Sequence, residues 1–180
     1  MRPPSVELRP LRESDVPVLV GWEADEVFCA HARWRPHRPY AEATAWWRDR
    51  IVSPDPFLLR LLAVSNGVPV GYADLHGDEP DARELGYLIA PSARWGEGLG
   101  TATARAALAR AFGDMRLHRV WAEAVEANAA SVQVLRRLGM RETGVGNEES
   151  FLGQPSRYVR FELLREEWET TRQRVRRGVS

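Results

Sequence analysis

The sequence predicts a single α/β domain of the α+β kind, with a mixed, mostly antiparallel seven-stranded sheet and about four flanking helices. Its 180 residues, of which 44% are hydrophobic, suffice to bury one core of ordinary size. Three consecutive runs of high β-propensity between residues 57 and 90 are joined by short turns, which predicts an antiparallel meander. The order strand, helix, strand between Leu85 and Val125 then predicts one crossover and one parallel pair.

In the first half of the chain, one strand and two helices precede the meander. SVELRPLRESD predicts a strand over residues 6–11 and a helix that starts at Ser14 or Asp15 and runs to about Ala24. The Pro- and Arg-rich segment AHARWRPHRPY is expected to be irregular. Asn66-Gly67 is a strong hairpin signal between two apolar runs. The second helix and the three strands of the meander are expected at residues 40–52, 57–65, 68–76 and 84–91.

The second half is expected to continue with helix, strand, helix and two strands. Asn128 is a natural N-cap, and Gly139 is expected to end the helix that Asn128 begins. NEESFLGQPS predicts a loop, and residues 165–180 a charged helical tail of the same domain. The five elements are expected at residues 99–112, 118–125, 128–138, 139–146 and 157–164. The buried face of the first of these helices is expected to consist of Leu99, Ala102, Ala106 and Ala109.

Composition excludes several kinds of chemistry. Acidic and basic residues balance at 25 each, and no lysine occurs that could form a Schiff base. The single cysteine, Cys29, excludes an internal disulfide and is expected to be buried and unreactive. His31 and His37 lack the spacing of metal ligands on a regular element, so no metal site is expected.

The chain also lacks the usual sequence signals of membrane proteins. No stretch approaches the ~20 apolar residues of a membrane span, and the N-terminus has no apolar core of signal-peptide length. We therefore expect a cytoplasmic protein without a membrane partner. The arginines of the tail lie beside the acidic run REEWE, which favours a solvated helix over an arm that binds nucleic acid. A homodimer is compatible with the sequence.

The run WGEGLG places Gly96, Gly98 and Gly100 directly before the alanine-rich helix. Backbone amides at a helix N-terminus lack partners within the helix, and the helix dipole favours anions there, so the run could hold a pyrophosphate. A strand-to-helix turn that requires positive φ explains the glycines equally well. The spacing excludes the dinucleotide fingerprint, which needs its third glycine one position later, and a P-loop needs a lysine.

The run also resembles a motif of the GNAT superfamily of acetyl-CoA-dependent N-acetyltransferases. That motif has Gln or Arg, two residues, Gly, one residue, and Gly or Ala, and Trp95, Gly98 and Gly100 occupy its positions. In having tryptophan at the first position, the sequence resembles the RimJ/RimL-like branch of the superfamily. That branch acetylates ribosomal-protein N-termini and includes antibiotic acetyltransferases. ELGYLIAPSARWGEGLGTATA, LHRVWAEAVEANAASVQVLRRLGM and FLGQPSRYVRFELLREEW resemble that branch in order and spacing. The resemblance implies a sheet splayed between its fourth and fifth strands.

The resemblance further implies which residues contact acetyl-CoA, with coenzyme A as the product. Many relatives have a tyrosine at the position of Leu135, so Ser131 becomes our candidate acid or hydrogen-bond donor to the leaving thiolate. The main chain of the strand is expected to contact the pantetheine arm, and the glycine loop the pyrophosphate. The expected cofactor-binding residues are Leu88, Ile89, Ala90, Trp95, Gly96, Glu97, Gly98, Leu99, Gly100, Thr101, Asn128 and Ser131.

Acetyl transfer to an amine requires the neutral amine, and a free alkylamine has a pKa near that of lysine, about 10.4, so a base assists. Glu84 begins the strand that leads into the glycine loop, and it occupies the position of the base in GNAT relatives. Glu123 is the second candidate base, and His76 the third. Glu84 could also be a solvated carboxylate at a strand start.

The variable loops are expected to select the acceptor. Glu148 and Glu149 could attract a cationic amine, and Trp34 could pack on a sugar ring or peptide, although core packing explains a single tryptophan as well. The expected function is acetylation of a primary amine by direct attack in a ternary complex, with a small amino sugar of the aminoglycoside type as the favoured acceptor. Protein N-terminal acetylation and a non-catalytic acetyl-CoA-binding module are the alternatives.

Overall fold

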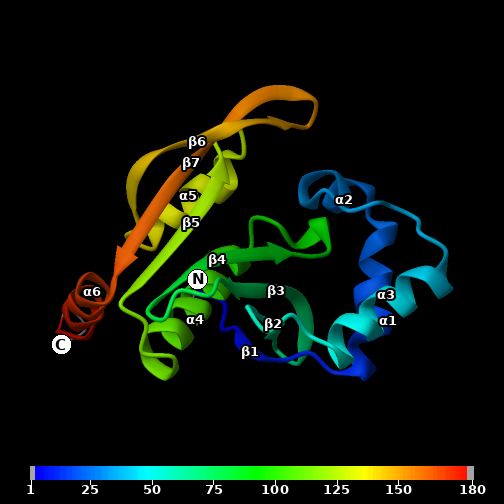
Figure 1. Cartoon of the computed structure of the whole chain (residues 1–180), viewed down its shortest axis with the longest axis horizontal. Helices are drawn as coiled ribbons and strands as arrows, with labels where there is room; N and C mark the ends of the chain where they lie inside the picture. Colours follow the sequence, from blue (N-terminus) through cyan, green and yellow to red (C-terminus); the bar gives the residue numbers. More distant parts are fainter. Residues whose placement is uncertain (1–2, 178–180) are drawn as a thin grey trace.

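The computed structural model describes residues 3–177 and is built around one mixed sheet (Figure 1). Its seven strands lie in the order β1-β2-β3-β4-β5-β7-β6. Neighbouring strands are antiparallel except β4 and β5, which are parallel. The predicted fold class is therefore confirmed, with the single parallel pair that the crossover requires. The strands are β1 (Glu7–Pro10), β2 (Leu58–Ser65), β3 (Val68–His76), β4 (Ala82–Ile89), β5 (Arg119–Val125), β6 (Arg141–Phe151) and β7 (Gln154–Leu164).

Helices cover both faces of the sheet (Figure 1). On one face, α1, α2 and α3 enclose a core that includes Leu62 and Tyr72. On the other face, α4 and α5 pack against β4, β5 and β7, and Trp168 of α6 joins that core. The helices of the described residues are α1 (Val16–Gly21), α2 (Glu26–Ala32), α3 (Tyr40–Val52), α4 (Leu99–Ala109), α5 (Ala129–Arg137) and α6 (Arg165–Arg177).

The first helical region differs from the prediction. The helix expected from residue 14 or 15 to about 24 is broken into α1 and two flanking 3₁₀ turns, Glu13–Asp15 and Trp22–Ala24. Asp15 does not cap α1 with its side chain, because its carboxylate accepts from the guanidinium of Arg9 at 2.7 and 2.8 Å. A further helix, α2, begins beyond this break, because the Asp25 carboxylate accepts from the Phe28 amide at 2.9 Å.

The predicted loop NEESFLGQPS is wrong, because these residues form the end of a long hairpin. β6 and β7 each have 11 residues and are joined by Leu152 and Gly153. Both residues have positive φ, 50° and 78°, which is the conformation that a two-residue hairpin turn of the favoured twist needs. Glu148 and Glu149 are consequently strand residues, opposite Arg157 and Ser156.

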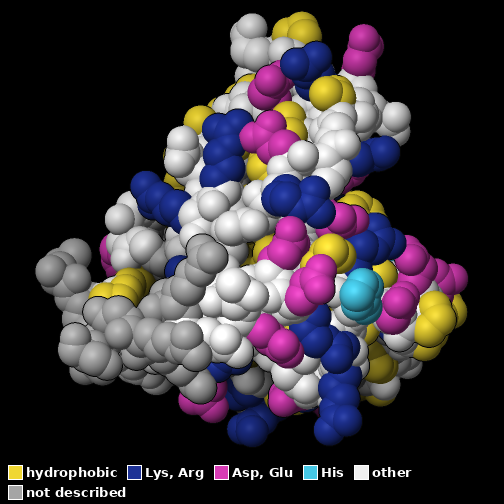
Figure 2. All heavy atoms as spheres, turned by 90° about the vertical axis from the view of Figure 1, so that its left-hand side faces the viewer, with side chains coloured by type: hydrophobic (Ala, Val, Ile, Leu, Met, Phe, Trp, Pro, Cys, Tyr) yellow, Lys and Arg dark blue, Asp and Glu magenta, His cyan; other side chains and the backbone are white. Residues whose placement is uncertain are grey.

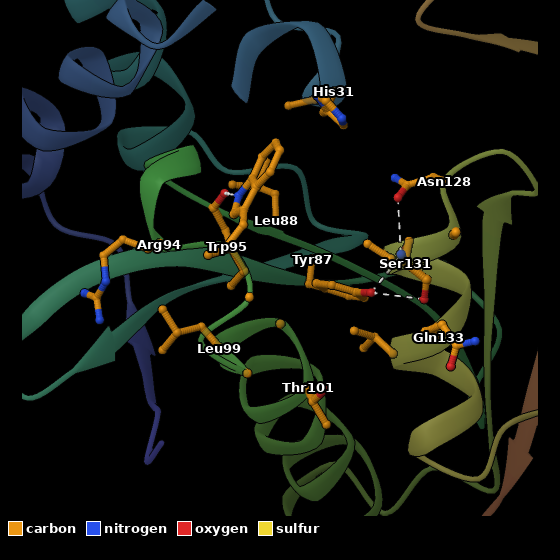
Figure 3. Close-up of a pocket in the computed structure, with 18 of the residues that line it drawn as sticks. His31, Tyr87, Leu88, Arg94, Trp95, Leu99, Thr101, Asn128, Ser131 and Gln133 are labelled. Atoms are coloured by element: carbon orange, nitrogen blue, oxygen red, sulfur yellow. Dashed lines mark hydrogen bonds between the residues drawn. The ribbon is translucent and has the colours of Figure 1, made fainter. Parts of the chain in front are cut away.

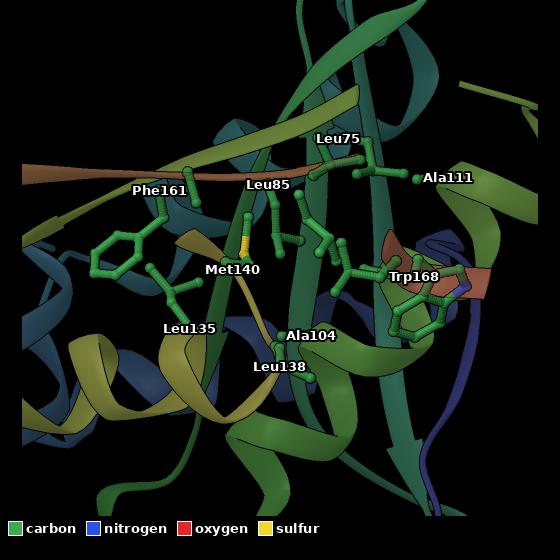
Figure 4. Packing of buried hydrophobic residues seen from close by; sticks show 14 of the residues in the cluster. Leu75, Leu85, Ala104, Ala111, Leu135, Leu138, Met140, Phe161 and Trp168 are labelled. Atoms are coloured by element: carbon green, nitrogen blue, oxygen red, sulfur yellow. The ribbon is translucent and has the colours of Figure 1, made fainter. Parts of the chain in front are cut away.

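The main core lies between the sheet and the helices α4 and α5 (Figure 4). Of the predicted face of α4, Leu99 is buried, but Ala102, Ala106 and Ala109 are only half-buried. The buried face of α4 is therefore a different one from the predicted face. Its fully buried alanines, Ala104 and Ala107, are small and allow the helix to lie close to the sheet. The buried residues of α4 and of the π-helical turn that follows it are Leu99, Thr103, Ala104, Ala107, Leu108, Ala111 and Phe112.

β4 and β5 diverge towards the glycine loop, and this divergence positions the site. Their pairing ends at Glu84 opposite Trp121. On its other side, β4 remains paired with β3 as far as Ile89. In an antiparallel pair, residues that bond their neighbour alternate with residues that face away. Because the Ala90 amide donates to Val70, the main chains of Ile89 and Tyr87 face the gap towards β5.

The surface carries mixed charge. On the face shown in Figure 2, arginine and acidic side chains are interspersed. Ion pairs link separate elements, as between Arg141 and Glu167 at 2.9 Å. The predicted charged tail is helical to Arg177, and its residues 178–180 lie outside the described residues. Within residues 3–177, no helix is long and apolar enough to span a membrane, and no cluster of His, Cys, Asp or Glu is arranged to hold a metal ion.

Candidate active site

A cavity of about 790 Å³ opens where β4 and β5 diverge (Figure 3). Its walls come from four segments that are distant in sequence. They are the end of β4 with the glycine loop, the first turns of α5, the inner side of α2, and the tip of the β6–β7 hairpin. The cavity therefore depends on the divergence of two strands that a regular sheet would keep paired.

The glycine loop forms one end of the cavity and requires positive φ at two positions. Gly96 has φ 83° and Gly98, the N-cap residue of α4, has φ 82°. Among the described residues, none of the amides from Gly96 to Thr101 has a backbone acceptor, and Ala102 is the first that donates within the helical pattern, to Gly98. The loop thus combines the turn and a set of free amides at a helix N-terminus, which fits a pyrophosphate.

Trp95 lines the cavity with its indole ring. Its Nε1 donates to the Ile89 carbonyl at 2.8 Å, so the side chain is held against the exposed edge of β4 (Figure 3). The His31 ring meets it edge-on, with centroids 4.7 Å apart. Trp95 is therefore part of the wall, and the only charged side chain that this loop adds to the cavity, within the described residues, is that of Arg94.

Two of the expected cofactor residues do not line the cavity. Ala90 is buried and its amide is engaged by the Val70 carbonyl at 3.0 Å. Glu97 forms an ion pair with Arg94 at 2.7 Å, and the hydrogen bond from Arg94 lowers the pKa of Glu97. The expected residues that do line it are Leu88, Ile89, Trp95, Gly96, Gly98, Leu99, Gly100, Thr101, Asn128 and Ser131.

The first turn of α5 forms the opposite wall. The Asn128 carboxamide oxygen accepts from the Ser131 amide at 3.2 Å, which confirms the predicted N-cap. The Tyr87 hydroxyl lies 3.1 Å from Ser131 Oγ, across the gap between β4 and α5 (Figure 3). Burial raises the pKa of Tyr87 to about 12, although the Ser131 contact acts in the opposite direction. Leu135 is buried in the core and offers no hydrogen-bonding group.

The sequence pattern does not single out Tyr87 as a site residue. In the strand ELGYLI it shares a face with Leu85 and Ile89, which is the face that α4 covers. A tyrosine at that register position was a usable signal, since a buried phenol needs a polar partner. Phe28, His31, Ala32 and Phe151, which also line the cavity, come from segments that were expected to be irregular or were not assigned to the site.

Glu84 lies on the opposite face of β4, at the last residue that pairs with β5. It is not among the residues that line the cavity, and its side chain is 35% exposed. Burial raises the pKa of Glu84, and the nearby negative charge of Glu123 raises it further. His76 Nδ1 is 3.9 Å from its Oε2, and no arginine pairs with it among the described residues.

Two other acidic side chains near Glu84, Glu123 and Asp74, are paired with arginines. Glu123 accepts from Arg160 Nε at 2.6 Å, and Asp74 binds Arg60 through two hydrogen bonds of 2.6 and 2.8 Å. Glu84 is consequently the carboxylate of this group whose charge is not balanced by an arginine.

The residues expected to bind the acceptor lie outside the cavity lining. Trp34 packs in an aromatic cluster, with ring centroids 5.0 Å from Phe28 and 5.5 Å from Trp47. Glu149 accepts from Arg33 at 2.7 Å, and this bond lowers the pKa of Glu149. Glu148 is exposed on β6. The structure therefore does not place these three residues in the wall of the cavity.

Asp25 holds helix α2 to the 3₁₀ turn Ser92–Arg94, which precedes the glycine loop. Its carboxylate accepts from the Ser92 amide at 2.6 Å and from Ser92 Oγ at 3.0 Å, in addition to capping α2 through Phe28. Although burial raises the pKa of Asp25, these hydrogen bonds prevail and lower it.

Replacing Asp25 with alanine is therefore expected to reduce the free energy of unfolding by about 1–2 kcal/mol. Because the folded-state pKa is lowered, the contribution is present above the unfolded pKa and is lost as the pH falls through the folded value. Thermal unfolding of the variant, with the exposed Asp49→Ala as control, should show a lower Tm at pH 7 and a smaller difference in acid. Equal Tm values for the two variants at pH 7 would contradict this role.

Residues 5–141 match the family model described as an acetyltransferase (GNAT) domain. Solved structures share the fold at low identity. Spermidine N-acetyltransferase from Vibrio cholerae, in complex with CoA and spermine, is 20% identical with a TM-score of 0.76, over 91% of this chain and 98% of that one.

Two further solved structures share the fold. RimL, a ribosomal L7/L12 α-N-protein acetyltransferase in complex with coenzyme A, is 18% identical with a TM-score of 0.77, over 91% of this chain and 96% of that one. An aminoglycoside acetyltransferase in complex with coenzyme A is 22% identical with a TM-score of 0.74, over 93% of this chain and 99% of that one. GNAT acetyltransferases use acetyl-CoA as donor. Because the family model spans about three quarters of the sequence, from the first strand to the start of β6, the chain belongs to the GNAT acetyltransferase family.

Proposed function

We propose that this N-acetyltransferase acetylates the primary amine of a small amino sugar of the aminoglycoside type, by direct attack in a ternary complex. The proposal rests on the environment of Glu84. This carboxylate is half-buried, its pKa is raised, and it has no arginine partner among the described residues. It is the last residue of β4 that pairs with β5, and beyond it the two strands separate around the cavity.

The residues of the cavity fit acetyl-CoA. The free amides from Gly96 to Thr101 would hold the pyrophosphate. The Ile89 amide and the main chain of Tyr87 would pair with the pantetheine arm, while the Ile89 carbonyl stays bound to Trp95. Leu88, Trp95 and Ser131 line the same space. When bound, acetyl-CoA supplies the acetyl group as a thioester. Gly98 has φ 82°, a backbone conformation in which any residue with a Cβ is strained.

Glu84 would take the proton of the acceptor amine. An alkylammonium has a pKa of about 10.4, so only a small fraction is neutral at pH 7, and a nearby carboxylate removes the proton as the amine reacts. A raised pKa makes Glu84 a stronger base than a solvated glutamate. Its uncompensated charge also attracts a cationic acceptor, since Asp74 and Glu123 are already paired.

The wall formed by α2 favours a small acceptor. The His31 and Phe151 rings meet edge-on with centroids 5.3 Å apart, and Arg33 binds Glu149 and the Ser150 carbonyl. These contacts join α2 to the β6–β7 hairpin beside the cavity. Such a connection leaves less room for the N-terminus of a folded protein than for a small polyamine or amino sugar.

Release of the coenzyme A thiol from acetyl-CoA, measured across a panel of amines, tests the proposal. The panel contains an amino sugar, a linear polyamine and a peptide with a free N-terminus, each matched with its N-acetylated form. We expect the highest kcat/KM with the amino sugar and no release with the acetylated forms. Turnover with the peptide alone would support protein N-terminal acetylation instead. Tight binding of acetyl-CoA without turnover of any amine would indicate a non-catalytic binding module.

A further inference from the structure

Two hydroxyl groups from opposite walls of the cavity meet at the first turn of α5. The Tyr87 hydroxyl lies 3.1 Å from Ser131 Oγ and 3.4 Å from the Ser131 carbonyl oxygen. Both residues line the cavity, and their side chains point towards each other across the gap (Figure 3). The removal of a proton by Glu84 uses neither of them, because Glu84 lies on the other face of β4.

The arrangement leaves the serine proton free. Both hydroxyls are protonated at neutral pH, and the distance alone allows either of them to donate. We assign the donor role to Tyr87, because a phenol is more acidic than an aliphatic hydroxyl and is therefore the better donor. Ser131 Oγ then accepts at 3.1 Å and can direct its own hydrogen elsewhere. The Ser131 amide is already bound by Asn128, and the N-terminal end of α5 adds partial positive charge.

We propose that Tyr87 is a positioning residue that, through Ser131, directs a hydroxyl hydrogen at the sulfur of bound coenzyme A and so stabilises its thiolate. The inference rests on the proposed function only in placing coenzyme A in this cavity. No proton leaves the pair, because a thiol with a pKa near 8.5 is a far stronger acid than a phenol of pKa about 12. The pair therefore stabilises the leaving sulfur by hydrogen bonding.

The pKa of the coenzyme A thiol in the binary complex measures this directly and requires no turnover. Thiolate absorbs in the ultraviolet, so a pH titration of the complex gives that pKa. In the unmodified protein we expect it to lie below the value of free coenzyme A. Ser131→Ala is expected to raise it by about one unit, and Tyr87→Phe by roughly half a unit. Because Tyr87 acts through Ser131, the thiol pKa in the double variant should equal that in Ser131→Ala.

Matched controls separate this role from packing. Tyr40→Phe removes a hydroxyl from an exposed tyrosine and should leave the thiol pKa unchanged. Ser131→Thr, which keeps a hydroxyl, should retain most of the effect. Affinity for desulfo-coenzyme A should be the same in the unmodified protein and in Tyr87→Phe, because the ligand has no sulfur to stabilise.

The proposal is overturned if the pKa of the bound thiol is the same in Tyr87→Phe as in the unmodified protein. It is also overturned if that pKa is the same in Ser131→Ala as in the unmodified protein. If Tyr87→Phe fails to fold, the comparison of Ser131→Ala with Ser131→Thr decides, since Ser131 is only half-buried and the role of Tyr87 depends on its hydroxyl; equal thiol pKa values in these two variants would then overturn the proposal. A shifted thiol pKa together with no acetylation of any amine would refute the proposed function and leave this inference standing.

Discussion

Replacing Glu84 with glutamine is expected to lower kcat about 10²–10³-fold at pH 7, with little change in KM for acetyl-CoA. Glutamine keeps the size of the side chain and removes its basicity. Glu84 faces away from α4 and does not line the cavity, so binding of the donor should not depend on it. Steady-state thiol release at saturating acetyl-CoA measures the loss.

The pH dependence identifies the base. In the unmodified protein, kcat should fall in acid through the raised pKa of Glu84, and this limb should disappear in Glu84→Gln. Glu123→Gln is the matched control. Because the charge of Glu123 raises the pKa of Glu84, its removal should move the limb to lower pH while most of the activity remains. A greater loss in Glu123→Gln than in Glu84→Gln would assign the base to Glu123.

Stability distinguishes lost chemistry from a lost fold. The folded-state pKa of Glu84 is raised, so its contribution to stability is present below the unfolded pKa and is lost as the pH rises through the folded value. At neutral pH the charged form is therefore unfavourable in the folded protein. Glu84→Gln should show a Tm equal to or above that of the unmodified protein while its activity falls.

Replacing Gly98 with valine is expected to raise KM for acetyl-CoA about tenfold or more, with a much smaller effect on KM for the amine. The residue caps α4 with φ 82°, where a β-branched side chain is strained by about 1–3 kcal/mol. Relief of this strain would turn the free amides of the loop away from the pyrophosphate.

Gly100→Ala is the matched control for this loop. Gly100 lies inside α4, and a Cβ there would make ordinary contacts of 3.5–3.9 Å with Val134, Tyr87 and Ile89. Alanine also favours a helix by about 0.5–1 kcal/mol over glycine. Kinetics with each substrate varied, and calorimetry of coenzyme A binding, should show an effect only at Gly98. An equal rise of both KM values in Gly98→Val would contradict the assignment of the loop to the donor.

The parts of the fold that follow local rules could be predicted from the sequence. Asn66-Gly67 supplies the conformations of a two-residue turn, and β2 and β3 pair around it. The helix at Tyr40–Val52 has the predicted bounds. The β6–β7 turn was missed because Leu152 adopts positive φ, which leucine rarely does. The pairing of two strands of 11 residues each offsets the free-energy cost of this backbone conformation.

The parts of the site that depend on tertiary contacts could not be predicted. Glu149 was expected to bind an acceptor, but it pairs with Arg33, which is 116 residues away. Tyr87 reaches Ser131 only because β4 and β5 separate, and no local pattern marks where that separation begins. The glycine loop was predictable because turn geometry and free amides both depend on neighbouring residues.

Two-substrate kinetics test direct transfer in one ternary complex most directly. The single cysteine, Cys29, is 1% exposed, its Sγ directed at the Trp22 and Glu23 carbonyls, so it offers no nucleophile to the cavity. Double-reciprocal plots of thiol release, with the amine varied at several concentrations of acetyl-CoA, should intersect, and no acetylated protein should accumulate without amine. Parallel lines, together with a protein that retains the acetyl group, would contradict the account.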